Sequence, residues 1–277
     1  MSTDLETALA ADRAIRRRAA TEVIRLTEGV VFRHPELDDV HYLNAVLLDR
    51  SPPGSPQLHG PAAAALAERW LGDRGHRHVV FDDATAGEQA AVELSGAGWE
   101  RSRMVFMAFG ADPGDVAVDP RSRLISEDEM KAHQLAALRE EAPEVAARSG
   151  LVARLVATQT RLRETTPSRC LGAGDRQGGL GSVCALFLDD DVGGRRVATV
   201  EEVGTLIAHR RRGLARAVVL AAVAYAGRWG AEMIVVPADA DDWPQVMYSG
   251  LGFVPVGRQV SLARRIRPPS GSVSGGV

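Results

Sequence analysis

The sequence predicts an α/β protein that contains two copies of one fold in tandem, and three observations support this prediction. Runs of β-branched and aromatic residues alternate with segments of helical period along the chain. The pattern Ser-Gly-x-Gly-aromatic occurs at residues 95–99 and again at residues 249–253, each time between an expected helix and an expected strand. A stretch rich in Gly, Pro and Asp, residues 110–120, separates the two halves. Chance recurrence of common turn residues is the alternative explanation of the repeat.

The first half alternates helices and strands. Its helices are expected at residues 4–27, at residues 62–71 and in a segment that ends at Glu93. Its strands are expected at residues 29–35, 41–49, 76–83 and 99–109, where β-branched and aromatic residues gather. Prolines between residues 50 and 61 exclude regular structure from that segment.

The second half is expected to begin with two helices. Ser126 is the predicted N-cap of the first, because acidic residues follow it directly and the helix can run toward Glu141. The second helix ends near Glu164. Strands are then expected at residues 168–175, 181–190, 195–206, 231–238 and 254–263, with helices between Gly213 and Gly230 and at residues 243–249.

The predicted domains follow the order of the sequence. Residues 1–115 form the first copy, residues 116–265 the second, and residues 266–277 a tail too poor in apolar residues to order itself. The residues able to carry chemistry lie in the second copy, where Tyr248 corresponds to Leu94 of the first. The first copy is therefore expected to be a degenerate scaffold.

Composition excludes several classes of function. The formal net charge of the 277 residues is -3, which argues against a general attraction to nucleic acid or to anionic membrane. No apolar run approaches the roughly 20 residues that span a bilayer, so the protein is expected in the cytoplasm, without a membrane partner. Cys170 and Cys184 lack the spacing of a metal site or a redox pair, and no metal is predicted.

The segment "HRRRGLA", residues 209–215, has the features of an anion-binding turn. A strand ends before it and a helix follows, and the first N–H groups of a helix have no partners within the helix. The helix dipole contributes only about 0.3 to 1 kcal/mol to anion binding, so Arg211, Arg212 or Arg216 would add charge-assisted contacts. The alternative, a solvated helix start, is weak because cations at a helix N-terminus oppose the dipole. Neither G-x-x-x-x-G-K-[ST] nor G-x-G-x-x-G occurs at this turn, which disfavours ATP and NAD.

Two motifs resemble those of the GNAT acyltransferases. Arg210, Gly213 and Ala215 in "RRRGLA" are similar to the family's R/Q-x-x-G-x-G/A signature, and "MYSGLGF" resembles its closing L-Y-x-x-x-G-F element, with Met247 in place of leucine. The resemblance covers about residues 116–265. It implies two tandem GNAT-like domains, each a mixed, mostly antiparallel twisted sheet flanked by helices, and acetyl-CoA as the acyl donor.

The resemblance also implies roles for matched residues. The backbone of Leu206, Ile207 and Ala208 would pair with the pantetheine arm of acetyl-CoA. The pyrophosphate would be bound by the turn and the helix start, which consist of Arg210, Arg211, Arg212, Gly213, Leu214, Ala215 and Arg216. Tyr248 would be the general acid that returns a proton to the CoA thiolate; an interface tyrosine is the alternative. The family often has proline where Ile207 stands and asparagine where Asp241 stands.

Glu201 and Glu202 are the candidate bases that accept a proton from the amine. Strict alternation along a strand sends their side chains to opposite faces, but a bulge in this strand, usual in the family, prevents a choice by parity. Both could also be ordinary surface acids.

The expected function is an acetyl-CoA-dependent N-acetyltransferase acting on a primary amine of a small molecule or a protein. One alternative keeps the fold and changes the acyl donor or the acceptor, as in enzymes of the mycothiol synthase type. Another is a catalytically silent acyl-CoA-binding regulatory protein. Nucleic-acid binding is disfavoured by the acidic stretches "LDDDVGG" and "DADDW". The acceptor and the acyl-chain preference stay open, and so does the choice between a monomer and a homodimer.

Overall fold

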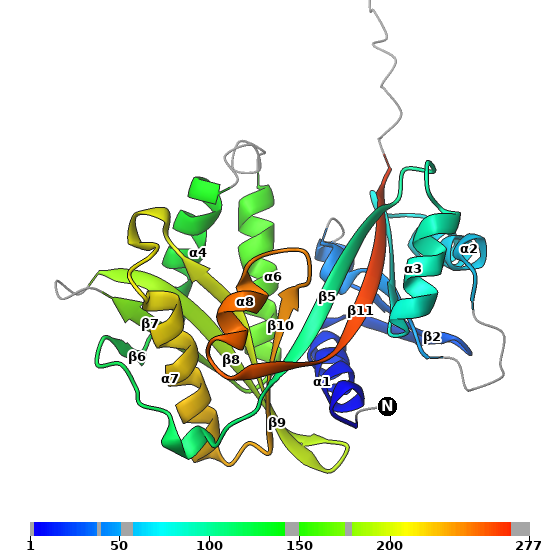
Figure 1. The fold of residues 1–277 in the computed structure, drawn as a ribbon. Helices are drawn as coiled ribbons and strands as arrows, with labels where there is room; N and C mark the ends of the chain where they lie inside the picture. The colour runs from blue at the N-terminus through cyan, green and yellow to red at the C-terminus, as the bar shows by residue number, and fades with distance from the viewer. Residues whose placement is uncertain (1–2, 38–39, 51–57, 142–149, 175–178, 267–277) are drawn as a thin grey trace, which may run out of the picture. The chain divides into compact units, whose positions relative to one another are not determined.

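The computed structural model describes residues 3–37, 40–50, 58–141, 150–174 and 179–266. Within them the chain forms two compact units (Figure 1). Unit 1 consists of residues 1–19 and 104–257, and unit 2 of residues 20–103 and 258–277. Apart from Ile266, the predicted tail lies outside the described residues.

Unit 1 contains a mixed sheet flanked by helices. Its strands are β6 (Ser122–Leu124), β7 (Ser168–Gly174), β8 (Leu180–Val192), β9 (Arg195–Thr205), β10 (Met233–Asp239) and parts of β5 (Glu100–Phe109) and β11 (Phe253–Arg265). Their order is β11-β5-β10-β9-β8-β7-β6, and β9 and β10 run parallel. The helices of unit 1 are α1 (Thr3–Ala19), α4 (Glu127–Glu141), α6 (Leu151–Thr165), α7 (Leu214–Trp229) and α8 (Pro244–Ser249), with short 3-10 turns η3 (Pro113–Asp115) and η4 (Ile207–His209).

Helices cover both faces of this sheet. Because side chains alternate along a strand, Ala198 and Val200 of β9 share a core cluster with α7, whereas Val197 packs with α1 on the other face. Neighbouring residues of β10 divide in the same way: Ile234 joins the α7 cluster and Val235 the α1 cluster. The helix before β10 ends at Gly230, as the sequence predicts.

Unit 2 is built from shorter strands. They are β1 (Glu22–Arg25), β2 (Gly29–Arg33), β3 (Ala45–Leu48), β4 (His76–Phe81) and the end of β11, in the order β1-β2-β3-β4-β11. The other elements of unit 2 are η1 (Pro35–Leu37), η2 (His41–Leu43), α2 (Gly60–Leu71) and α3 (Ala84–Glu93). β3 and β4 are parallel and joined by α2, and α3 follows, which repeats the succession β9, α7, β10, α8 of unit 1.

The repeated glycine motif has the same backbone conformation at its second glycine in both units. Gly98 has φ 76° and Gly252 has φ 99°, and glycine alone adopts this region without strain. The local geometry therefore agrees with two copies of one fold.

The two copies exchange their last strands. Residues Met104–Phe109 of β5 belong to unit 1, where Ala108 pairs with Val235 of β10. The end of β11 belongs to unit 2, where Val260 pairs with Phe81 of β4. The compact units therefore interleave along the chain, whereas the predicted copies at residues 1–115 and 116–265 follow sequence order and stay a prediction.

Most predicted elements are confirmed, and the exceptions have local causes. The helix predicted over residues 4–27 ends at Ala19, because the β-branched residues after it form β1. The segment at residues 110–120 is no free linker, since Pro113 of η3 packs against Gly227 of α7. The predicted cap is present: Ser126 Oγ accepts from Glu129 N at 3.2 Å, and Ser126 N donates to the Glu129 carboxylate at 2.9 Å.

We expect Asn44→Ala to destabilise unit 2 by about 3 kcal/mol. The Asn44 side chain is fully buried, accepts a hydrogen bond from His34 N at 2.9 Å and donates to the carbonyls of Leu37 (2.7 Å) and Val40 (3.0 Å). Alanine leaves these backbone groups without that partner. Native-state hydrogen exchange of unit 2 amides measures the loss. Thr7→Ala, which removes an exposed side-chain bond, is the control, and an equal effect of both variants contradicts the prediction.

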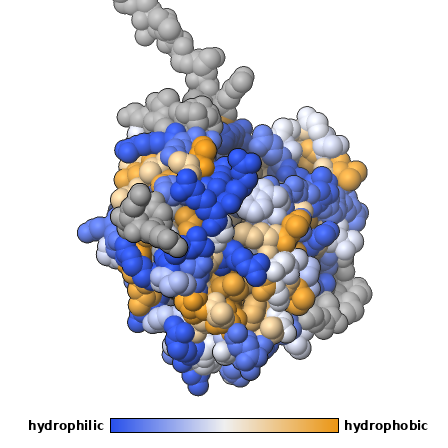
Figure 2. Space-filling model, turned by 60° about the vertical axis from the view of Figure 1, so that its left-hand side comes forward, coloured by the Kyte–Doolittle hydropathy of each residue, from blue (hydrophilic) through white to orange (hydrophobic). Residues whose placement is uncertain are grey.

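The surface combines both kinds of residue. Figure 2 shows one face on which hydrophobic residues are interspersed among hydrophilic ones. In the part of the chain that the structure describes, no helix is both long enough and apolar enough to cross a membrane.

Candidate active site

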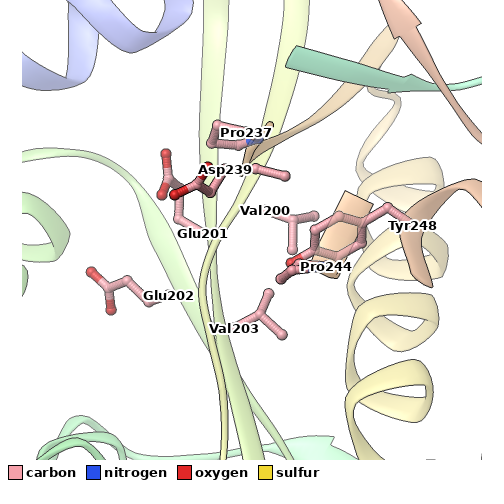
Figure 3. Close-up of a pocket in the computed structure, with 9 residues that line it drawn as sticks. Val200, Glu201, Glu202, Val203, Pro237, Asp239, Pro244 and Tyr248 are labelled. Atoms are coloured by element: carbon pink, nitrogen blue, oxygen red, sulfur yellow. The ribbon is translucent and has the colours of Figure 1, made fainter. Parts of the chain in front are cut away.

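A pocket opens where β9 and β10 separate. The parallel pairing of β9 with β10 ends at Thr199 and Val235, although both strands continue beyond these residues. Pro237 of β10 has no N–H group and cannot donate a further hydrogen bond to β9. A pocket of about 250 Å³ follows (Figure 3). It is lined by Val200, Glu201, Glu202, Val203, Pro237, Ala238, Asp239, Pro244 and Tyr248. The structure thus brings the three predicted catalytic candidates together.

A β-bulge decides where the two glutamates point. Ala185 of β8 pairs with Glu201, but Val183 pairs with Gly204, so β9 has one residue more than β8 between these pairs. Glu202 has φ 55°, a left-handed conformation. Figure 3 shows both carboxylates on one side of β9 and the Tyr248 ring on the other. The bulge is present, so strict alternation does not decide the orientation of the glutamates.

Glu202 is held by a buried network. Its Oε2 accepts a hydrogen bond from Gln134 Nε2 at 2.8 Å and another from Arg163. The Arg163 side chain is 2% exposed and also binds Glu127 at 2.6 Å. Burial raises the pKa of Glu202 to about 7, against the opposite effect of Arg163 and Gln134. These contacts join α4 and α6 to the bulge, and they give Glu202 a structural part.

Glu201 is the carboxylate left to the pocket. No described residue donates a hydrogen bond to its side chain. Burial raises the pKa of Glu201 to about 8, and the negative charges of Asp12 and Glu202 add to this effect, while Arg16 opposes it. A carboxylate whose pKa lies near neutral pH is suited to accept a proton from an amine.

Tyr248 lies on α8, whose first residue is Pro244, the residue type preferred at this position. Its side chain is 5% exposed, and its ring meets Phe253 edge-on at 5.9 Å between centroids. Burial raises the pKa of Tyr248 well above its usual value, and Cys184 and Glu201 contribute. The phenol therefore keeps its proton and is a donor.

The backbone between β9 and α7 presents a row of N–H groups. Arg210 N donates to Ile207 O, and Ala217 N donates to Gly213 O. Between these two bonds, the N–H groups of residues 211–216 donate to no acceptor within the described residues. Arg211 (φ 60°) and Gly213 (φ 74°) are both left-handed, a backbone form that gathers N–H groups around an anion. The donor set fits the diphosphate of a coenzyme.

Cations surround this turn. Arg211, Arg212 and Arg216 are exposed and form no ion pair with any described residue. A fourth guanidinium, that of Arg121, donates to Arg212 O at 3.1 Å but is paired with Asp119 at 2.7 Å. Cations near a helix N-terminus are repelled by the helix dipole, and a bound anion would reduce this repulsion. Arg210, unlike Arg211, Arg212 and Arg216, forms an ion pair within the protein, with Glu141. Its side chain also donates to Thr205 O, and these contacts stabilise the turn.

In residues 206–208, unlike residues 211–216, two backbone N–H groups already have acceptors within the protein. Leu206 N donates to Gly181 O at 3.0 Å, and Ile207 N donates to the Glu140 carboxylate at 2.9 Å. The contact of this stretch with a pantetheine arm stays a prediction. Beyond Thr199, the edge of β9 that turns away from β8 has no pairing with β10.

Sequence reasoning missed several charged residues at the site. Arg163 follows Val156 and Thr160 on the buried stripe of α6. A charged residue inside a buried stripe could have been recognised in the sequence as one that needs a buried partner. The same holds for Asp12 and Arg16, which continue the buried stripe of α1. For Arg121 the sequence offers no signal.

Residues 133–253 match the model of the acetyltransferase (GNAT) family. No curated protein matches the sequence.

Solved structures with a similar fold include the following three. A conserved protein of unknown function from Staphylococcus epidermidis ATCC 12228 has a TM-score of 0.69 at 12% identity, over 90% of this chain and 95% of that one. A GCN5-related N-acetyltransferase from Kribbella flavida has a TM-score of 0.58 at 20% identity, over 97% of each chain. A tandem GNAT protein from the clavulanic acid biosynthesis pathway, without AcCoA, has a TM-score of 0.51 at 16% identity, over 82% of this chain and 77% of that one. At these identities the similarity shows the fold.

Proposed function

Because residues 133–253 match the model of the acetyltransferase (GNAT) family, we propose that the protein is an acetyl-CoA-dependent N-acetyltransferase of primary amines. The observation that supports the proposal is the position of the pocket with Glu201 and Tyr248 on β9 and α8, while the unpaired N–H row follows β9 directly. The residues proposed to act on the acceptor amine and those proposed to bind acetyl-CoA therefore lie on or next to the same strand, β9.

Donor binding would use the turn and the open strand edge. The N–H groups of residues 211–216 would hold the diphosphate, with Arg211, Arg212 and Arg216 neutralising its charge. The edge of β9 beyond Thr199 would pair with the amides of the pantetheine arm, which places the thioester at the pocket.

Acetyl transfer then needs two proton movements. Glu201 accepts a proton from the ammonium of the acceptor, so that the nitrogen lone pair can attack the thioester carbonyl carbon. The C–N bond forms and the C–S bond breaks. Tyr248 donates its proton to the departing sulfur, and the second proton of the nitrogen is transferred to the phenolate through solvent, which restores the phenol. Glu201 then releases the proton it accepted to solvent. The products are the amide and CoA with its free thiol.

The acceptor is a small-molecule amine or a protein amine, and Asp239 at the pocket favours a cationic one. Release of free thiol from acetyl-CoA in the presence of an amine library tests the proposal. Turnover with another acyl-CoA alone supports a changed donor, and CoA binding without thiol release from any acyl-CoA supports a silent regulatory protein. Location in the cytoplasm and a monomeric or homodimeric state stay predictions from the sequence.

We expect kcat/KM to rise with pH through about 8, because Glu201 must be ionised to accept a proton and its raised pKa places this step there. Glu201→Gln should lower kcat/KM at pH 9 at least about tenfold, as is usual for the loss of a general base. Stopped-flow or steady-state rates from pH 4 to 10 measure both. Asp242→Asn, an exposed acid outside the pocket lining, is the control. A limb near pH 4.5 in the wild type would exclude Glu201 as the base.

A further inference from the structure

Helix α1 carries a buried ion pair, Asp12 with Arg16. Leu5, Ala8 and Leu9 pack on the sheet of unit 1 together with Val197 and Val235. Asp12 and Arg16 continue the same stripe of the helix, with side chains 9% and 8% exposed, and Arg16 Nε donates to Asp12 Oδ2 at 2.8 Å. A buried pair costs desolvation that its own attraction seldom returns, so a pair at this position suggests a functional role.

Glu201 lies on the sheet face that α1 covers. Val197, Thr199 and Glu201 alternate with residues of the α7 face, and Val197 contacts the stripe of α1. The bulge begins only after Glu201, so this parity is undisturbed up to it.

Charged groups from several elements surround Glu201. α1 contributes Asp12 and Arg16, whose charges act on Glu201 in opposite directions. Glu202 lies next to it on β9 but is bound by Arg163 of α6 and Gln134 of α4. Asp239 of β10 is exposed, and Tyr248 of α8 is neutral. Asp12 is therefore the acid from another element that opposes ionisation of Glu201.

Resting on the proposed role of Glu201, we propose that Asp12, held by Arg16, is a positioning residue for acetyl transfer that keeps Glu201 a strong base. The physical reason is that two carboxylates in a poorly solvated site do not ionise together easily. Arg16 pairs with Asp12 at 2.8 Å and so fixes that carboxylate on the face of the sheet where Glu201 lies, while Glu201 has no hydrogen-bond donor of its own among the described residues. The N-terminal helix, expected from the sequence to belong to a scaffold, is then part of the catalytic unit.

The decisive experiment is a carboxyl-carbon NMR titration of the full-length protein without ligand, with the Glu201 signal assigned by Glu201→Gln. Asp12→Asn should move the Glu201 midpoint to lower pH by about 1 pH unit, because a negative charge is removed. Arg16→Gln should move it to higher pH, because Asp12 then acts without compensation. Asp4→Asn, which breaks the exposed pair with Arg195 on the same helix, should leave it unchanged.

Opposite shifts cannot come from a general loss of structure, which would move both midpoints toward that of a solvated carboxyl. No shift, or shifts in one direction, overturns the inference. If Asp12→Asn fails to fold, Arg16→Gln decides alone, since a rise supports the inference and a fall or no change refutes it.

The titration separates this inference from the proposed function. If no amine is acetylated, the NMR midpoints still show whether Asp12 controls Glu201. If amines are acetylated, the acid limb of the kcat/KM profile of Asp12→Asn should shift together with the NMR midpoint of Glu201. If it does not shift, the proposed function is retained and the role assigned to Asp12 is refuted.

Discussion

Tyr248→Phe is expected to lower kcat at least about tenfold, with little change in the affinity for acetyl-CoA. The phenol is 5% exposed, and its raised pKa keeps it protonated, so that it can act only as a donor. Its proton matters when charge develops on sulfur as the C–S bond breaks. A group used only at that stage lowers kcat and kcat/KM together when it is removed. Phenylalanine keeps the ring contact with Phe253, so the fold of the pocket should persist.

Rates with saturating acetyl-CoA and calorimetric binding of CoA measure the two quantities separately. Tyr225→Phe is a matched control, because Tyr225 lies on α7 outside the pocket lining. Its hydroxyl accepts a hydrogen bond from Arg169 at 3.0 Å. An unchanged kcat in Tyr248→Phe removes this residue from the mechanism. A loss of CoA affinity with unchanged kcat would assign it to binding.

Gly213→Asp is expected to abolish measurable binding of acetyl-CoA. Gly213 has φ 74°, where a side chain strains the backbone. The new carboxylate would also stand beside the N–H groups that should hold the diphosphate, and like charges repel. Steric strain and charge act in the same direction, so this single change should have the largest effect on binding.

Gly213→Ala separates the two causes, because it brings the strain without the charge and should weaken binding much less. Gly193→Asp is the positional control: Gly193 also has positive φ, 63°, but its added Cβ meets open space in the turn between β8 and β9. Isothermal titration calorimetry with CoA measures all three variants. Retained affinity in Gly213→Asp would refute the assignment of the phosphate turn.

The sequence predicts local structure well where one segment carries its own signals. The helical period after Gly213, its stop at Gly230 and the capping box of Ser126 are confirmed. The exchange of β5 and β11 could not be predicted, because strand pairing depends on contacts between residues far apart in the chain. The end of α1 was missed because Glu22–Arg25 become a strand by pairing with β2, a contact that the segment alone does not reveal.

The site divides in the same way. The motifs predicted the turn around Gly213 and the candidate Tyr248, and the place of Glu201 and Glu202 on the strand before the turn made them the candidate bases. The structure brings these three candidates to one pocket. Which glutamate is free depends on Arg163 and Gln134, which approach the bulge from two other helices. Spacing in the sequence cannot report such contacts, although both residues occupy buried helix positions that polar side chains rarely take without a partner.

The central claim is that the backbone N–H groups of residues 211–216 bind the diphosphate of acetyl-CoA and so direct its thioester to Glu201 and Tyr248. A crystal structure of the full-length protein with bound CoA tests it most directly. We predict diphosphate oxygens at about 3 Å from backbone nitrogens of residues 211–216, with the sulfur at the pocket between β9 and β10. A diphosphate bound elsewhere on the chain, with these N–H groups left to solvent, would contradict the claim.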